Sequence, residues 1–252
     1  MNSAAYQKVA VVTGSSKGIG KAIAIRLAKD GFFVYVTFHT DEAGGCSTMN
    51  EIKQIGGKAS LQKLDVSNEN SVSQLMSLID REFGHLDVLV NNAVKDVSKR
   101  MEDSSFDEWK LAIDTKLHGA CLSTKYALPL LKQSENANVI MISSSADVSP
   151  SPDILSYAIA TAALNAFIKA MAIHLPPYGI RVNAVMPGQV RTANWGELEN
   201  DDELWKKFAD QNPMKRVATV EDVADSVMIF INDPHRFLNG NLFFVNGGNH
   251  LH

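Results

Sequence analysis

Two kinds of hydrophobic pattern alternate along the chain. Short runs of nearly continuous apolar residues are typical of strands covered on both faces, and stretches with apolar residues every three or four positions are typical of helices. The first pattern predicts strands at Lys8–Thr13, Phe32–Phe38, Ala59–Val66, Leu86–Asn91, Asn138–Ser143, Ile180–Met186 and Asn241–Val245. The second pattern predicts helices at 18–30, 41–55, 68–83, 104–132, 154–175 and 219–232.

The regular alternation of strand and helix predicts the fold class. Parallel strands joined through helices require right-handed crossovers, which gives an α/β fold with a doubly wound sheet. We therefore expect one domain over residues 1–252, with a seven-stranded, mainly parallel sheet and helices on both faces. The segment 191–218 is different, because it is irregular and polar, contains Trp195 and Trp205, and is too long for a simple connection. We predict a substrate loop at about 191–218.

The composition excludes several classes of protein. Hydrophobic residues make up 45% of the 252 residues and charged residues 21%, close to the average for globular domains. The net charge of −4 gives no basic excess to bind a phosphate backbone, so we expect no nucleic-acid partner. Helix 154–175 is long and apolar, but polar residues are spaced through it, so we expect no membrane span. The N-terminal residues do not resemble a signal peptide, and we expect a cytoplasmic protein.

Cysteine and histidine give no sign of a metal site. Cys46 and Cys121 lie outside any CxxC or CxxH arrangement, so we expect neither a structural zinc site nor a disulfide framework. The histidines are isolated, apart from His250 and His252 at the end of the chain, where histidines more often fray than bind a metal. We therefore expect no catalytic metal.

A glycine-rich segment, TGSSKGIG at 13–20, joins the first predicted strand to the first predicted helix. Glycines permit a tight turn and let backbone amides approach a pyrophosphate, and the helix N-terminus adds unpaired N–H groups and a partial positive charge. This spacing of glycines is a weak signal by itself. Its place between a strand and a helix is the context that a dinucleotide-binding loop requires, and it argues against an ordinary glycine turn.

Further motifs follow in the order in which one protein family has them. They are Asn91-Asn92-Ala93, Tyr157 after a serine-rich strand end, GIRVNAVMPG at 179–188 and VNGG at 245–248. Together with the glycine loop, they resemble the short-chain dehydrogenase/reductase family over nearly the whole chain, and within it the 3-oxoacyl-carrier-protein reductase branch. The resemblance implies a Rossmann-type domain that binds a nicotinamide cofactor and reduces a carbonyl group.

The resemblance also implies which residues hold the cofactor. Asp65 and Val66 would bind the adenine, Asn92 and Ala93 would line the adenosine ribose, and Val190 would face the nicotinamide amide. The residues expected around the phosphates are Gly14, Ser15, Ser16, Lys17, Ile19 and Gly20.

The end of the second predicted strand indicates which nicotinamide is used. An acidic residue there would bind the ribose 2′-hydroxyl of NAD and repel a 2′-phosphate. The strand instead ends in Phe38-His39-Thr40, which has no acid, and Lys17 in the glycine loop offers a cation near the same place. The missing acid carries more of this inference than Lys17, since lysines are common in solvated loops. We expect NADP(H), with His39 beside it.

Two of the four catalytic positions implied by the resemblance differ in this sequence. Tyr157 stands at the position of the proton donor, and Ser144 stands at that of the serine that hydrogen-bonds the carbonyl oxygen. The family has a lysine where this chain has Thr161, and an asparagine in the preceding long helix where our alignment places Lys116. Thr161 carries no charge, but its hydroxyl is able to bond the nicotinamide ribose or Tyr157, which lies one helical turn away.

Lys116 offers the charge that Thr161 lacks. A phenol ionises only near pH 10, and a nearby ammonium stabilises its ionised form. A helical wheel places Lys116 on the inward stripe beside Trp109 and Ala120, where a charge without a partner or function is costly. The alternative is that the ammonium reaches solvent while its stem packs. We favour a catalytic Lys116, because it coincides with a catalytic position of the family.

Two functional hypotheses remain open. The first is an NADP(H)-dependent oxidoreductase that reduces a ketone, with a 3-oxoacyl compound as one candidate. The second is a catalytically weakened family member that binds NADP(H) as a sensor or structural partner. The expected partners are a small-molecule carbonyl substrate and further copies of the chain in a homotetramer, because helix 154–175 is apolar on two sides. The sequence lacks an evident basic patch for an acidic carrier protein, which argues against dependence on one.

Overall fold

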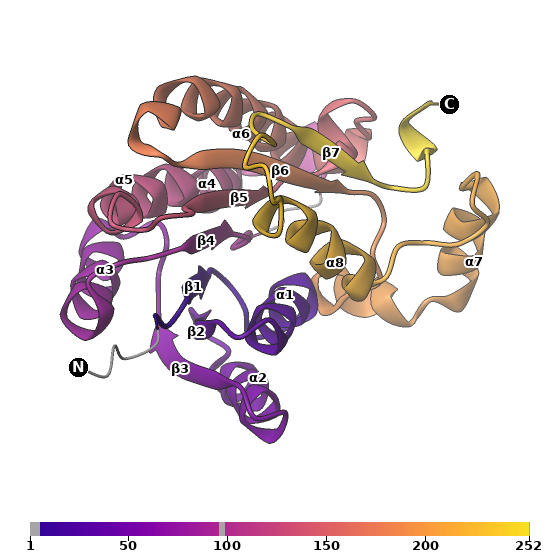
Figure 1. The fold of residues 1–252 in the computed structure, drawn as a ribbon. Helices are drawn as coiled ribbons and strands as arrows, with labels where there is room; N and C mark the ends of the chain where they lie inside the picture. The colour runs from indigo at the N-terminus through magenta and orange to yellow at the C-terminus, as the bar shows by residue number, and fades with distance from the viewer. Residues whose placement is uncertain (1–5, 96–98, 252) are drawn as a thin grey trace, which may run out of the picture.

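The sheet has all seven strands in parallel, in the order β3-β2-β1-β4-β5-β6-β7 (Figure 1). This computed structural model describes residues 6–95 and 99–251. The predicted α/β fold is confirmed, and each predicted strand is present with small shifts at its ends. The strands are β1 (Val9–Val12), β2 (Phe33–Phe38), β3 (Lys58–Lys63), β4 (Val88–Asn91), β5 (Asn138–Ile142), β6 (Arg181–Pro187) and β7 (Leu242–Val245).

Two helical layers cover the sheet, as Figure 1 shows. On one face lie α1 (Gly18–Lys29), α2 (Glu42–Gln54) and α8 (Val220–Ile231), and on the other lie α3 (Glu69–Phe83), α5 (Gly119–Leu131) and α6 (Leu155–His174). Successive side chains of a strand point to opposite faces, so Val9 and Val11 enter one core while Ala10 and Val12 enter the other. This double burial explains why the strands read as continuous apolar runs.

The predicted helix 104–132 is divided. It begins with α4 (Phe106–Ile113), where Ser105 and Glu108 form a capping box, and it continues through one π-helical turn, Asp114–His118, into α5. A π turn holds one more residue than an α turn and is frequent at functional sites. Lys116 lies in the middle of this turn.

The segment 191–218 is more ordered than predicted. It contains a helix, α7 (Asp202–Gln211), whose N-terminus is capped by the Asp201 carboxylate accepting from the Leu204 N–H. The rings of Trp195, Trp205 and Phe208 pack together with centroid separations of 5.1 to 5.7 Å. The prediction of an irregular segment was wrong: α7 is short and mostly polar, but its apolar residues Leu204, Trp205 and Phe208 fall on one helical face.

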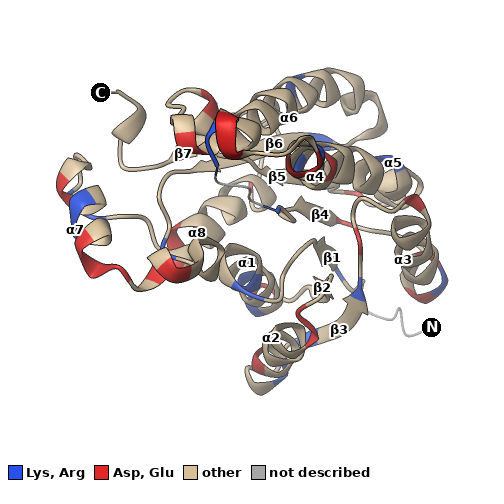
Figure 2. Cartoon of the chain, turned by 180° about the vertical axis from the view of Figure 1, so that it is seen from behind, with Lys and Arg blue, Asp and Glu red and all other residues tan. Residues whose placement is uncertain are grey.

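Helix α6 is long and apolar enough, over Pro152–His174, to cross a membrane by length and composition alone. The core helix of a soluble protein passes the same test, so this observation is weak. In the structure α6 packs against β6 and α4, and its buried face carries the polar residues Thr161 and Asn165. Its outer face exposes Ile159 and Ile173 and is largely free of charge, whereas α2, α3 and α7 are richly charged (Figure 2).

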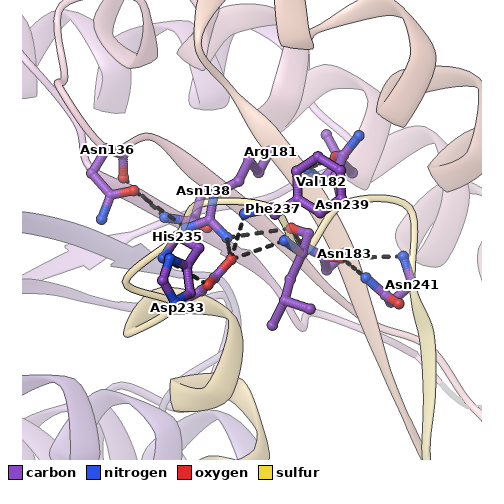
Figure 3. A network of polar contacts seen from close by, with 11 residues as sticks. Asn136, Asn138, Arg181, Val182, Asn183, Asp233, His235, Phe237, Asn239 and Asn241 are labelled. Carbon is purple, nitrogen blue, oxygen red and sulfur yellow. Dashed lines mark hydrogen bonds and ion pairs between the residues drawn. The ribbon is translucent and has the colours of Figure 1, made fainter.

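A buried ion pair lies at the amino-terminal end of β6, on the edge of the sheet opposite the carboxyl ends of the strands. The Arg181 guanidinium at the start of β6 lies 3.4 Å from the Asp233 carboxylate, and both side chains are buried (Figure 3). Asp233 also accepts from the backbone N–H groups of His235, Phe237 and Leu238, which lowers its pKa. The pair therefore fixes the loop between α8 and β7 against the sheet.

Candidate active site

A cavity of about 460 Å³ runs along the carboxyl ends of the strands. The chain order reverses between β1 and β4, and open parallel sheets bind their ligands at such a point. The cavity is lined by all three predicted catalytic residues, Ser144, Tyr157 and Lys116. It is also lined by most of the predicted cofactor residues, namely Gly14, Ser16, Lys17, Ile19, Gly20, His39, Asp65, Val66, Asn92, Ala93 and Val190.

The glycine loop fits tightly between β1 and β4. Gly14 has a φ of +64°, and a Cβ there would lie 3.0 Å from the Ala93 Cα, so glycine is required both by conformation and by space. Helix α1 starts directly after this loop, and its N-cap residue, Lys17, makes no side-chain cap. The first N–H groups of α1 therefore lack a side-chain acceptor at the edge of the cavity, which suits a phosphate.

Two predicted cofactor residues have structural roles instead. Ser15 is fully buried, and its hydroxyl donates to the Val12 carbonyl while accepting from the Thr37 N–H, so it joins β1 to β2 and does not line the cavity. Asn92 lines the cavity, but its amide donates to the Thr13 and Gly14 carbonyls and holds the glycine loop in place. The Ser15 hydroxyl is thus engaged with the backbone, and its contact with the phosphates stays a prediction.

At the adenosine end of the cavity, the acidic side chains have hydrogen-bond partners and the basic side chain of Lys17 has no ion-pair partner among the described residues. Asp41 caps α2 by accepting from the Gly44 N–H, and Asp65 accepts from the backbone and hydroxyl of Ser67. His39 is 62% exposed, with its Nε2 3.7 Å from the Asp65 carboxylate. Lys17 is exposed and forms no ion pair with any described residue. The two carboxylates thus have partners at this end, and the Lys17 ammonium is open to an anion.

Lys116 and Tyr157 meet at the centre of the cavity. The Lys116 Nζ lies 3.2 Å from the Tyr157 hydroxyl oxygen and 4.3 Å from the centre of its ring. Lys116 is only 4% exposed, and no carboxylate of a described residue lies within 4.0 Å of its Nζ. The helical wheel placed this side chain on the inward face, as the structure has it, and its ammonium does not reach solvent. Tyr157 is its partner.

The π turn and a glycine bring Lys116 to this place. A Cβ on Gly119 would lie 2.7 Å from a Val66 methyl group, so only glycine lets the start of α5 approach the loop after β3 so closely. Beside Lys116 is a void of about 10 Å³ whose lining includes Thr13, Asn91 and Thr115, roughly the space of one water molecule. Thr13, Asn91 and Thr115 are thus polar neighbours of Lys116 at this void.

Ser144 is oriented by its own loop. Its hydroxyl oxygen accepts from the Ala146 N–H at 3.2 Å, which leaves the hydroxyl hydrogen to be donated into the cavity. Next to it in the chain, the Ser143 hydroxyl donates to the side-chain oxygen of Asn165, and the side-chain N–H of Asn165 donates to the Asp147 carboxylate. This buried chain ties the loop after β5 to α6, the helix that carries Tyr157.

Of the two predicted partners of Thr161, the ribose and Tyr157, the structure has the second, through the Tyr157 backbone. It is 0% exposed, is not among the residues that line the cavity, and donates its hydroxyl to the Tyr157 backbone carbonyl at 2.8 Å. Threonine in a helix commonly bonds the carbonyl four residues earlier, and this bond occupies its only donor. A contact from the Thr161 hydroxyl to the cofactor ribose is therefore not supported.

The opposite rim of the cavity includes one residue of the predicted substrate loop, Trp195, and three residues that the sequence patterns did not indicate. Gln189, Trp195, Asn249 and His250 also line the cavity. His250 is ordered rather than frayed, with its ring stacked on Phe244 at 3.9 Å, while His252 lies outside the described residues. The only sequence feature that could have indicated an ordered His250 is its spacing of six residues from Phe244 in the last strand. This spacing does not by itself predict a ring stack.

Comparison with known proteins identifies the family. The family model described as Enoyl-(Acyl carrier protein) reductase matches residues 14–250. The chain is 35% identical to Glucose 1-dehydrogenase 2 of Bacillus subtilis (strain 168), covering 96% of this chain and 94% of that protein. It is 33% identical to 3beta-hydroxysteroid dehydrogenase 1 of Eggerthella lenta, covering 96% and 93%. The chain belongs to the short-chain dehydrogenase/reductase family.

A solved structure of this family has the same architecture. The reductase LugOII, described as catalysing keto-reduction at C1 during lugdunomycin biosynthesis, superposes with a TM-score of 0.89 at 31% identity, covering 96% of this chain and 98% of that one. As a short-chain dehydrogenase/reductase, the protein is an oxidoreductase that uses a nicotinamide cofactor. The open N-terminus of α1, the Gly14 turn and the length of the cavity fit such a group.

Proposed function

We propose that the protein is an NADP(H)-dependent reductase of ketones in which Lys116 takes the place of the lysine that the family resemblance implies at Thr161. The observation that carries this proposal is the 3.2 Å contact between the Lys116 ammonium and the Tyr157 hydroxyl, inside a cavity that also holds Ser144. A buried ammonium without a carboxylate partner is costly to keep, and its contact with Tyr157 gives it a chemical role.

Tyr157 supplies the proton in this scheme. A nicotinamide cofactor, when bound, would supply the hydride for the carbonyl carbon, and negative charge would develop on the carbonyl oxygen. The Tyr157 hydroxyl donates its proton to that oxygen, which leaves a phenolate. The Lys116 ammonium donates a hydrogen bond to the phenolate oxygen and lowers the energy of the negative charge as it forms.

Ser144 orients the carbonyl group. Because its oxygen already accepts from the Ala146 N–H, its hydrogen is directed to another acceptor, and the carbonyl oxygen of a substrate meets that requirement. Two donors, from Ser144 and Tyr157, then act on one oxygen. This arrangement stabilises the developing alkoxide more than the starting ketone, which is what lowers a barrier.

The preference for NADP(H) is supported by the adenosine end of the cavity. Lys17 has no carboxylate partner among the described residues, and the end of β2, Phe38-His39-Thr40, carries no acid that would select NAD. Asp41 is engaged as a helix cap, so its charge is partly offset by the N–H groups of α2. A 2′-phosphate would meet one ammonium and one imidazole here.

The side chains at Tyr157 and Ser144 specify a ketone as the substrate class and nothing narrower. The names of the relatives refer to glucose and to a 3β-hydroxysteroid, and the family model refers to an acyl carrier protein. These compounds share a carbonyl or its alcohol and little else. A 3-oxoacyl compound remains one candidate, and a homotetramer is proposed from the exposed apolar face of α6.

The proposal is tested by following NADPH oxidation with a panel of ketones and 3-oxoacyl thioesters, with Tyr157→Phe as the comparison. We expect turnover by the unmodified protein and a loss of about 10²-fold or more in Tyr157→Phe, since positioned acid–base catalysis contributes that much. NADPH affinity, measured by nucleotide fluorescence, should be unchanged in the variant. Tight NADPH binding without turnover of any compound would favour the weakened cofactor binder instead.

A further inference from the structure

The C-terminal turn forms part of the cavity wall. After β7 the chain turns at Gly247 and Gly248, both with positive φ, and a short helical turn, Asn249–Leu251, follows. Figure 1 shows this end of the chain on the same side of the sheet as α7. Asn249 and His250 line the cavity together with Tyr157. These side chains therefore form part of the same cavity wall as Tyr157.

The hydrogen bonds of His250 determine which of its nitrogens carries the proton. Its Nδ1 lies 3.0 Å from the Asn246 side-chain oxygen. That same oxygen accepts the Gly248 backbone N–H at 3.1 Å, so it acts as an acceptor at this site. His250 must then donate from Nδ1, and in the neutral ring Nε2 is left as a bare acceptor. No described residue donates a hydrogen bond to Nε2.

The ring of His250 is held in place before any ligand arrives. It stacks on the Phe244 ring with centroids 3.9 Å apart and an angle of 7° between the planes. The stack and the Nδ1 bond together fix the ring on two sides. A fixed acceptor at a cavity wall binds a hydroxyl group without first losing its own conformational freedom.

The neighbours of His250 extend the polar wall. The Asn249 amide donates to the Gln189 side-chain oxygen at 3.4 Å. Each side-chain amide has an oxygen that accepts and an NH₂ group that donates. The single bond between the two therefore leaves the Asn249 oxygen and the Gln189 NH₂ group for a ligand. Trp195 differs, because its indole N–H is already donated to the Val190 carbonyl and its ring is apolar. This part of the cavity wall thus combines the aromatic ring of Trp195 with the three hydrogen-bonding side chains of Gln189, Asn249 and His250.

We infer that His250, Asn249 and Gln189 bind hydroxyl groups of the substrate, and that the substrate is a polyhydroxylated ketone of the sugar type. A carbon chain with several hydroxyl groups presents C–H surface to Trp195 and donors and acceptors to the polar wall. An unsubstituted alkyl ketone leaves these polar groups without partners, which costs affinity. This inference rests on the proposed ketone reductase activity and specifies its substrate class.

The test compares two substrates of equal chain length, erythrulose and 2-butanone, in the unmodified protein and two variants. His250→Gln places an amide near the position of Nε2, and His250→Asn places it near Nδ1, while both lose the ring stack. We expect kcat/KM for erythrulose to exceed that for 2-butanone in the unmodified protein. His250→Asn should raise the KM for erythrulose about three- to tenfold, as for one lost hydrogen bond, and leave 2-butanone unchanged. His250→Gln, which retains an amide near the position of Nε2, should raise the KM for erythrulose by less than His250→Asn does.

Binding measured without turnover separates this inference from the proposed function. Erythrulose is titrated into the protein saturated with NADP⁺, followed by tryptophan fluorescence. Loss of binding in His250→Asn but not in His250→Gln supports the inference even if no ketone is reduced. Equal effects of the two variants, or a preference for 2-butanone in the unmodified protein, would overturn it while leaving ketone reduction intact.

Discussion

Replacement of Lys116 by methionine removes the charge beside Tyr157 and retains most of the side-chain volume. The Nζ to Oη distance of 3.2 Å corresponds to roughly 5 kcal/mol between unit charges at an effective dielectric constant of about 20. If the tyrosine carries about half a unit of charge in the transition state, about 2.5 kcal/mol is lost from the barrier reduction, or roughly 10²-fold in rate. We expect this decrease in kcat for ketone reduction by Lys116→Met.

The assay is steady-state NADPH oxidation together with a single turnover at saturating NADPH. The matched control is Lys110→Met in α4, where the lysine is exposed and pairs with Asp114 on the outside of the same helical segment. The control should keep its full activity. A decrease of less than about threefold in Lys116→Met would refute the reasoning.

Three further outcomes are expected. His39→Asp should weaken NADPH binding by about tenfold or more and spare NADH, measured by nucleotide fluorescence, because a carboxylate repels the 2′-phosphate; equal losses for both would contradict it. Light scattering should show a tetramer that dissociates in Ile173→Glu, since Ile173 is exposed on the apolar face of α6; a monomer in the unmodified protein would rule this out. Asp233→Asn should lower the Tm at pH 7, and the difference in Tm from the unmodified protein should shrink as the pH falls below about 4. The reason is that the pKa of Asp233 is lowered in the folded protein, so its stabilising contribution is present above about pH 4 and is lost as the carboxylate is protonated. An unchanged difference in Tm across this pH range would count against the ion pair.

The fold was predictable because its signals are periodic and long. Strands buried on both faces must be apolar throughout, and every parallel connection needs a helix, so the pattern predicts both elements and order. Helix α7 was missed because it is only ten residues long and mostly polar, although Leu204, Trp205 and Phe208 mark one apolar face. The π turn at Asp114–His118 was missed because nothing in a helical sequence marks an extra residue in one turn.

Within the site, sequence reasoning succeeded where a residue type has few alternative roles. The glycines of the loop and the inward lysine at 116 are of this kind, because their alternatives are costly. The roles of Ser15 and Thr161 were harder to predict, because small hydroxyl side chains bond the backbone as readily as they bond a ligand, and both bond the backbone here. His250 was dismissed as frayed, since the stack on Phe244 and the bond to Asn246 arise only when the C-terminal turn folds back.

The exchange of the lysine between two positions tests the central claim most directly. Four proteins are compared under the same conditions by single-turnover reduction of the best ketone: the unmodified chain, Lys116→Asn, Thr161→Lys and the double variant. The account predicts that Lys116→Asn alone is strongly impaired and that the double variant recovers activity, because Thr161 lies one turn from Tyr157 on the same face of α6. Thermal unfolding confirms that each variant is folded. An inactive unmodified protein that Thr161→Lys alone makes active would contradict the account and identify a weakened cofactor binder.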